Sequence, residues 1–184
     1  MVKINQLDEN LNINGKRVLL RVDFNVPIND GAITEASRIE KILPTIKFLI
    51  NKKAKIIIIS HIGRPKGKIV PSLTLKPIAK KLSNYLNQNI VFLNESIGPI
   101  VIQNSKTILN GEILLLENIR FNKEEELNSE SFGKELSKIG DIYKRSVFMF
   151  SQSSYFCLRI NKTHQFFCGQ TAFRRSKCFK NVNR

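Results

Sequence analysis

The sequence has too few cysteines, in the wrong arrangement, for a cysteine-based metal site or a disulfide framework. Among 184 residues only Cys157, Cys168 and Cys178 are present, and no two of them form a C-x-x-C pair. Structural zinc sites usually need closely spaced ligand pairs, and disulfide frameworks usually need an even number of cysteines. We therefore expect neither a metal site nor disulfides.

Signals for export, membrane insertion and nucleotide binding are also lacking. The first residues, MVKINQLDEN, contain no apolar core of a signal peptide, and no apolar run approaches the length that spans a membrane. Neither G-x-x-x-x-G-K-S/T nor G-x-G-x-x-G occurs, so no cofactor-binding residues can be located for a nucleotide. We expect a cytoplasmic protein without a membrane partner.

Acidic residues are absent after position 143. All 15 Asp and Glu lie in residues 1–143, whereas residues 144–184 hold 9 Lys and Arg, all three Cys and 7 of the 12 Phe. Such a basic tail is either an arm that binds nucleic acid or a sequence that was not selected to fold. It has no recognisable nucleic-acid-binding motif, so we do not expect that partner. Salt-dependent binding that is lost with the tail would indicate the alternative.

The first 143 residues alternate between two apolar patterns. Short runs typical of buried parallel strands cover 17–26, 54–60, 89–93 and 111–118. Amphipathic patterns typical of helices cover 37–54, 73–88 and 128–143; Pro44 predicts a kink or restart in the first, and Tyr143 lies on the apolar face of the last. This alternation predicts an α/β fold, a Rossmann-like parallel sheet with helices on both faces.

Basic residues follow the second predicted strand, at the sheet edge where ligands bind in such folds. The stretch SHIGRPKGK (60–68) contains His61, Arg64, Lys66 and Lys68, and its two glycines permit close backbone approach. This composition suits an anion such as phosphate or carboxylate, and it equally suits a solvated basic loop.

Two arginines and two polar residues are expected at the same edge. Arg38 opens a helix and Arg120 follows a strand, so each can bind an anion, or else pair with an acid nearby in the sequence. Asp23 and Asn25 end the first strand on the same side, where they can contact substrate, hold an arginine or cap the turn. Together they suggest a small, multiply anionic substrate. We interpret KEEE (123–126) as a solvated helix start.

Four stretches closely resemble phosphoglycerate kinase in order and spacing. They are RVDFNVP (21–27), SHIGRPKG (60–67), LLLENIRFNKEEELN (114–128) and SFGKELSKIGDIY (131–143). The resemblance covers about residues 12–143. It implies a glycolytic enzyme, usually monomeric, that transfers a phosphoryl group reversibly between ATP and the carboxylate of 3-phosphoglycerate. It also implies an N-terminal domain for 3-phosphoglycerate and a hinged C-terminal domain for Mg-ATP or Mg-ADP.

The resemblance implies roles for particular residues. Arg38 would contact the substrate carboxylate and act catalytically by stabilising the transferring phosphoryl group. The substrate-binding residues would be Asp23, Phe24, Asn25, Arg38, His61, Ile62, Gly63, Arg64 and Arg120.

The sequence departs from the family after DIY. The family continues with a motif like N-D-A-F-x-x-x-H-R-A-H, whereas KRSVFMFSQSS stands here. Codons can be chosen for residues 144–153 that read, one base later, N-D-Q-F-S-C-S-H-R-A. We hypothesise that residues 1–143 are a partial substrate-binding domain and that residues 144–184 are an aberrant, out-of-frame tail. With the nucleotide-binding domain absent, we expect the fragment to be inactive alone. Noncatalytic binding of a small phosphorylated anion is the alternative function.

Overall fold

The computed structural model describes residues 12–29, 31–146 and 165–168. Its centre is a six-stranded sheet in the order β5-β6-β4-β1-β7-β8, in which every pairing is parallel. The strands are β1 (Arg17–Val22), β4 (Lys55–Ile59), β5 (Ile90–Leu93), β6 (Ile113–Leu116), β7 (Ile142–Ser146) and β8 (Gln165–Cys168). A short antiparallel pair, β2 (Ile28–Asn29) and β3 (Ala32–Ile33), lies apart from this sheet.

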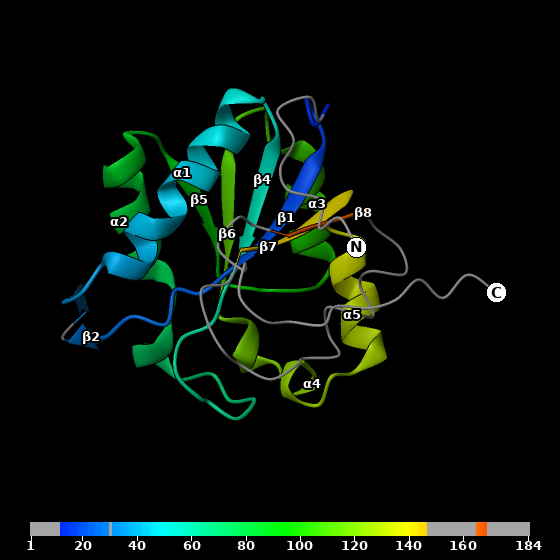
Figure 1. The fold of residues 1–184 in the computed structure, drawn as a ribbon. Coiled ribbons are helices and arrows are strands. Elements are labelled where there is room, and N and C mark those ends of the chain that lie inside the picture. Colours follow the sequence, from blue (N-terminus) through cyan, green and yellow to red (C-terminus); the bar gives the residue numbers. More distant parts are fainter. Residues whose placement is uncertain (1–11, 30, 147–164, 169–184) are drawn as a thin grey trace, which may run out of the picture.

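Helices cover both faces of the sheet. Figure 1 shows α1 (Ser37–Asn51) and α2 (Lys76–Leu86) on one side, and α3 (Pro99–Thr107) and α5 (Glu130–Ser137) on the other. Side chains alternate along each strand, so Leu20 and Ile58 enter the core beneath α1 and α2, whereas Leu19 and Ile57 enter the core beneath α3 and α5. The predicted parallel α/β fold with helices on both faces is confirmed.

Several element boundaries differ from the predictions. The first strand ends at Val22 rather than at residue 26, and α1 continues through Pro44 without a restart. The helix expected over 128–143 ends at Ser137, and Tyr143 lies in β7 instead of on a helical face. Gly140 permits this turn, because a Cβ there would lie 2.9 Å from Leu19 Cβ and would push β7 away from β1. Helix α3 was not predicted.

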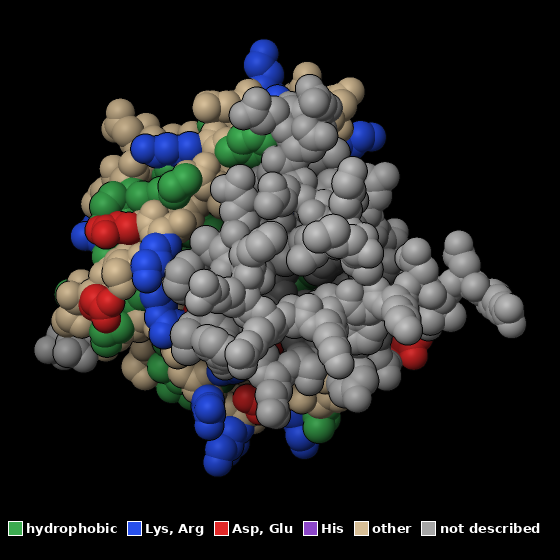
Figure 2. Space-filling view, viewed as in Figure 1, with side chains coloured by type: hydrophobic (Ala, Val, Ile, Leu, Met, Phe, Trp, Pro, Cys, Tyr) green, Lys and Arg blue, Asp and Glu red, His purple; other side chains and the backbone are tan. Residues whose placement is uncertain are grey.

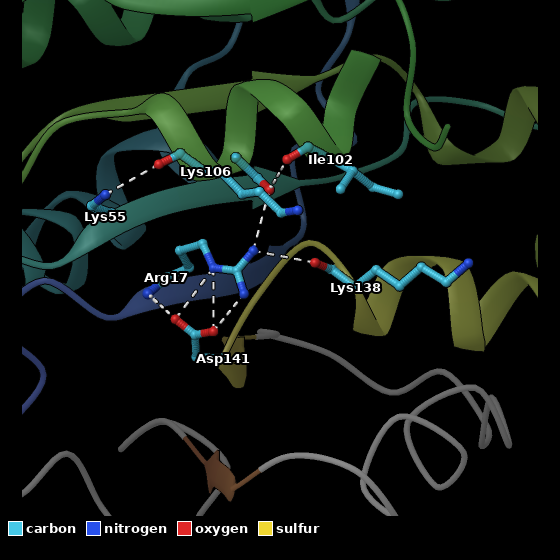
Figure 3. Close-up of polar contacts among 7 residues, drawn as sticks. Arg17, Lys55, Ile102, Lys106, Lys138 and Asp141 are labelled. Atoms are coloured by element: carbon cyan, nitrogen blue, oxygen red, sulfur yellow. Dashed lines mark hydrogen bonds and ion pairs between the residues drawn. The ribbon is translucent and has the colours of Figure 1, made fainter. Parts of the chain in front are cut away.

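At the amino ends of the strands, Arg17 joins β1 to the segment between α5 and β7 (Figure 3). Its Nη2 donates to Asp141 Oδ1 over 2.6 Å, and its Nη1 donates to the carbonyl of Lys138 over 3.2 Å. Burial raises the pKa of Asp141, but hydrogen bonds from Arg17 and the charges of Arg17 and Lys16 outweigh it and hold that pKa below its usual value. This contact is structural and lies at the edge of the sheet opposite the carboxyl ends of the strands.

The predicted boundary between residues 143 and 144 falls inside β7. This strand pairs along β1 from Ile142 to Ser146, and Lys144 is buried. Residues 147–164 and 169–184, which carry most of the hypothesised tail, lie outside the described residues. Within the described ranges, no helix is both long enough and apolar enough to cross a bilayer.

Candidate functional site

Three loops meet at the carboxyl ends of β1, β4 and β6. They are residues 23–27 after β1, residues 60–75 after β4, and residues 117–128 after β6, which contain the 3₁₀ turn η2 (Ile119–Phe121) and the short helix α4 (Lys123–Glu126). Figure 1 shows α4 and the loop after β4 at the lower edge of the molecule. Lys and Arg side chains are prominent along that edge in Figure 2. Within these loops, Arg64, Lys66, Lys68 and Lys123 are exposed.

Asp23 and Asn25 hold neighbouring elements in place. The Asp23 carboxylate forms a close ion pair with Arg38 at the start of α1, and it also accepts a 3.0 Å hydrogen bond from the backbone N–H of Asn25. Asn25 Oδ1 accepts a 3.0 Å bond from the backbone N–H of Gly63. Of the uses that the sequence left open for Asp23, the structure shows that it holds an arginine. Arg38 remains partly exposed, with 40% of its side chain accessible.

The side chains of Phe24 and Ile62 belong to the hydrophobic core rather than to the surface of the site. Phe24 is 0% exposed and Ile62 is 4% exposed. Ser60 fixes the backbone beside them, because its hydroxyl accepts from the N–H of Phe24 and donates to the carbonyl of Val22, each over 3.0 Å. These two predicted substrate-binding residues can reach a ligand through their backbone only.

The loop after β4 packs tightly against its neighbours, and two of its glycines make this possible. Gly63 has φ +62, and a Cβ there would lie 3.0 Å from the side chain of Leu73. Gly67 has φ +73, and a Cβ there would lie 2.6 Å from Lys123 Cβ and 2.8 Å from its Cα. Both positions therefore require glycine, for conformation and for space.

Asn118 connects the loop after β6 to the loop after β4. Its Nδ2 donates to the carbonyls of Ile62 and Leu73, each over 2.9 Å. Its Oδ1 accepts a 3.1 Å bond from the backbone N–H of Arg120, which begins the turn that carries the arginine side chain. One fully buried amide thereby fixes Arg120 relative to the basic loop.

Arg120 and Arg21 share one buried acid. Arg120 Nη1 donates to the carbonyl of Gly63 over 2.8 Å, and Arg120 Nε lies 3.8 Å from Glu125 Oε2. Glu125 Oε1 accepts a 2.7 Å bond from Nη2 of Arg21, which projects from β1. Arg64, in contrast, is exposed and makes no hydrogen bond or ion pair with other described residues.

His61 lies among the arginines. Burial, followed by the positive charges of Arg120, Arg21 and Arg38, lowers the pKa of His61 from 6.5 to about 3. Its Nδ1 is buried and has no hydrogen-bond partner within the part of the chain that the structure describes. The ring is therefore neutral at neutral pH, and three guanidinium groups lie close enough to repel a proton on it.

The structure also brings two unpredicted residues to this edge. Arg21 was read as part of an apolar strand, although its spacing of two from Asp23 was a signal that both lie on one side. Glu125 was read as one residue of a solvated helix start, yet it is 6% exposed, so the KEEE interpretation is wrong at this residue. Neither Glu117 nor Glu124 pairs with Arg120; the carboxylate of Glu117 instead accepts the N–H of Leu75 before α2.

No group of three or more His, Cys, Asp or Glu side chains in the described ranges is placed to hold a metal ion. The carboxylates at this edge face arginines, as Asp23 and Glu125 show, and this donor set does not fit a cation.

The fold and the site together define an α/β protein with an arginine-rich loop cluster at the carboxyl edge of its sheet. The sequence model described as "Phosphoglycerate kinase" matches residues 8–158. The chain belongs to the phosphoglycerate kinase family.

Relatives and solved structures agree with this assignment. The chain is 49% identical to phosphoglycerate kinase of Finegoldia magna over 142 residues, which are 76% of this chain and 36% of the relative. It is 49% identical to the Leptospira biflexa enzyme over 140 residues, 76% of this chain and 35% of the relative. The structure from Coxiella burnetii matches with a TM-score of 0.75 at 34% identity and covers 87% of this chain and 40% of its own. The chain thus spans about a third of the length of the curated relatives.

Proposed function

We propose that this chain supplies the 3-phosphoglycerate side of a cytoplasmic, monomeric phosphoglycerate kinase. The observation that carries the proposal is the grouping of Arg21, Arg38 and Arg120 around His61 at the carboxyl edge of the sheet. Exposed Arg64 adds a further positive charge. Since arginine binds carboxylate and phosphate oxygens through paired N–H groups, this edge suits an anion with both groups.

The proposed roles follow the contacts of each residue. Arg38 contacts the substrate carboxylate and stabilises the transferring phosphoryl group, and Asp23 orients Arg38 through their ion pair. Asn25 Oδ1 accepts a hydrogen bond from the N–H of Gly63, and Asn25 Nδ2 donates to a substrate hydroxyl. His61, Arg64 and Arg120 receive the phosphate, whereas Phe24, Ile62 and Gly63 contribute backbone.

In the proposed reaction, a carboxylate oxygen of 3-phosphoglycerate attacks the γ-phosphorus of ATP. The bond from that phosphorus to the bridging oxygen of ADP breaks, and 1,3-bisphosphoglycerate forms. Positive charge near the carboxylate offsets the charge that accumulates on the transferring group. In this reaction the described residues bind 3-phosphoglycerate only, and Mg-ATP or Mg-ADP binds a separate C-terminal domain of the family rather than residues of this chain.

The domain boundary and the origin of the tail remain part of the proposal. Residues 1–143 would be the substrate-binding α/β part, and residues 144–184 would be an out-of-frame tail. Sequencing the DNA from codon 140 onward tests this directly. A frame one base later that encodes N-D-x-F followed by H-R supports the hypothesis, and a +1 frame without that motif overturns it.

Calorimetric titration of the purified chain with 3-phosphoglycerate tests the binding site. We expect saturable binding that is much weaker for glycerate, which lacks the phosphate, and much weaker for Arg38→Gln. The control is Lys106→Gln, which removes one exposed positive charge from the opposite edge of the sheet. Equal loss of binding in both variants, or no binding by the wild-type chain, would contradict the proposal.

A further inference from the structure

Helix α4 contains three consecutive glutamates that differ sharply in environment. Glu124 and Glu126 are exposed, whereas Glu125 is 6% exposed. A buried carboxylate is costly unless it is paired and hydrogen-bonded, and Glu125 meets that condition through a hydrogen bond from Arg21 and a longer ion pair with Arg120. Its two oxygens face different partners: Oε1 lies 2.7 Å from Arg21 Nη2, and Oε2 lies 3.8 Å from Arg120 Nε.

These contacts place Glu125 between two like charges. Arg21 and Arg120 both lie against the Glu125 carboxylate, so their guanidinium groups lie near each other. Without an intervening acid, two guanidinium groups in this partly buried place would repel one another. Glu125 offsets that repulsion and fixes where each group lies.

The effect of Glu125 extends through Arg120 to the basic loop. Arg120 Nη1 donates to the carbonyl of Gly63, and the N–H of Gly63 donates to Asn25. A single connected series of contacts therefore runs from Glu125 to Asn25, across the three loops of the site. Each member has its position set before any ligand arrives.

We propose that Glu125 is a positioning residue for the anion site: by pairing with Arg21 and Arg120 it holds Arg120 in the position that receives the substrate phosphate. This proposal rests on the proposed function, because it names the device that preorganises the same site. A preorganised arginine loses less conformational freedom on binding, so the benefit of Glu125 exceeds the repulsion between its charge and the anion.

The three glutamates of α4 provide a matched test. Glu125→Gln, Glu124→Gln and Glu126→Gln each remove one negative charge from the same short helix. We expect Glu125→Gln to weaken 3-phosphoglycerate binding roughly tenfold, as is typical when a supporting contact is lost. The two control variants should bind within about twofold of wild type or slightly more tightly, since their charges are exposed and screened. Glu125→Asp, which keeps the charge, should recover part of the affinity.

NMR signals of the two arginine side chains distinguish an effect of Glu125 on their positions from an effect on the stability of the whole fold. In ¹⁵N NMR spectra of the free wild-type chain, the Nη–H signals of Arg21 and Arg120 should be resolved and slowly exchanging, because Arg21 Nη2 is hydrogen-bonded to Glu125 and Arg120 Nη1 to the carbonyl of Gly63. They should broaden or shift in Glu125→Gln and stay unchanged in Glu124→Gln. This measurement needs no ligand. The spectrum of the wild-type chain tests the proposal even if a variant does not fold.

The outcomes are distinguishable. Failure of the wild-type chain to bind 3-phosphoglycerate would overturn the proposed function, while the arginine signals would still report on Glu125. Wild-type binding together with equal or tighter binding by folded Glu125→Gln would overturn the positioning role alone. Nη–H signals of both arginines that are averaged by fast rotation in the free wild-type chain would overturn it as well.

Discussion

At the amino edge of the central sheet, every side-chain nitrogen of Arg17 has a protein partner, whereas the arginines at the carboxyl edge outnumber the carboxylates that pair with them in the described residues. Each side-chain nitrogen of Arg17 donates to an oxygen of Asp141, Lys138 or Ser105 (Figure 3). At the other edge, Arg38 pairs with Asp23, Arg21 and Arg120 share Glu125, and Arg64 is exposed without an ion pair to another described residue. The local balance of charge, rather than the residue type, therefore distinguishes a structural arginine from one that can bind an anion.

The tightest packing at the carboxyl edge should give the largest effect on stability. Gly67→Ala places a Cβ against Lys123 in a left-handed backbone conformation, so we expect a loss of about 3 kcal/mol in the free energy of unfolding. Gly31→Ala is the matched control, because Gly31 has φ +76 with no atom within 4 Å of the added Cβ. It should cost about 1 kcal/mol. Equal losses in urea denaturation would contradict the packing of the loop on α4.

Exchanging arginine for glutamine at each edge should separate binding from stability. Arg120→Gln should lose about 2 kcal/mol of binding free energy for 3-phosphoglycerate, or roughly thirtyfold in affinity. Arg17→Gln should leave the affinity of the folded chain unchanged and lower its melting temperature. Calorimetry and thermal denaturation of both variants check this. Loss of affinity in Arg17→Gln, or none in Arg120→Gln, would erase the distinction between the edges.

His61 should make the carboxyl edge sensitive to mild acid. Its pKa is about 3 in the folded chain and 6.5 in the unfolded chain, so the unfolded state binds more protons between these values. The free energy of unfolding should therefore fall as pH drops below 6.5, by about 1.4 kcal/mol per unit in the middle of this range. His61→Gln should flatten that slope in urea titrations from pH 7 to 4. If His61→Gln and the wild-type chain showed the same dependence of unfolding free energy on pH, the His61 ring would be exposed to solvent in the folded chain.

The amino edge should respond only to stronger acid and by a smaller amount. Because the folded pKa of Asp141 is lowered, its ion pair contributes stability at neutral pH and loses it as pH falls below 3.8. Asp141→Asn should cost about 1 kcal/mol at pH 7, since the carboxylate is 38% exposed and partly screened. The difference from wild type should vanish near pH 2. A difference that persists there would show that the charge is not what matters.

The sequence predicted the elements whose patterns are local and regular. The parallel strands and helices α1 and α2 follow from apolar periodicity, and the basic loop follows from its position after a buried strand. Helix α3 was missed because its pattern is irregular: Ile100 is 52% exposed while Ser105 is 0% exposed. Its sequence thus lacks the apolar face that identifies an amphipathic helix.

Residues whose environment depends on distant partners could not be predicted locally. Glu125 is buried because it meets Arg21, which is 104 positions away in the sequence. Arg38 pairs with Asp23 and not with Glu35 or Glu40, which are closer to it in the sequence. Tyr143 continues a helical spacing but lies in β7, where Gly140 brings the chain against Leu19. In each case tertiary contact outweighed the local pattern.

NMR titration of the His61 ring, with and without 3-phosphoglycerate, would show directly whether the arginine cluster at the carboxyl edge binds this anion. The ring reports both the charge of the arginine cluster and the arrival of an anion beside it. We predict a pKa near 3 in the free chain that rises when 3-phosphoglycerate is bound, because the anion offsets the guanidinium charges. A ring that titrates near 6.5 in both states would contradict the account.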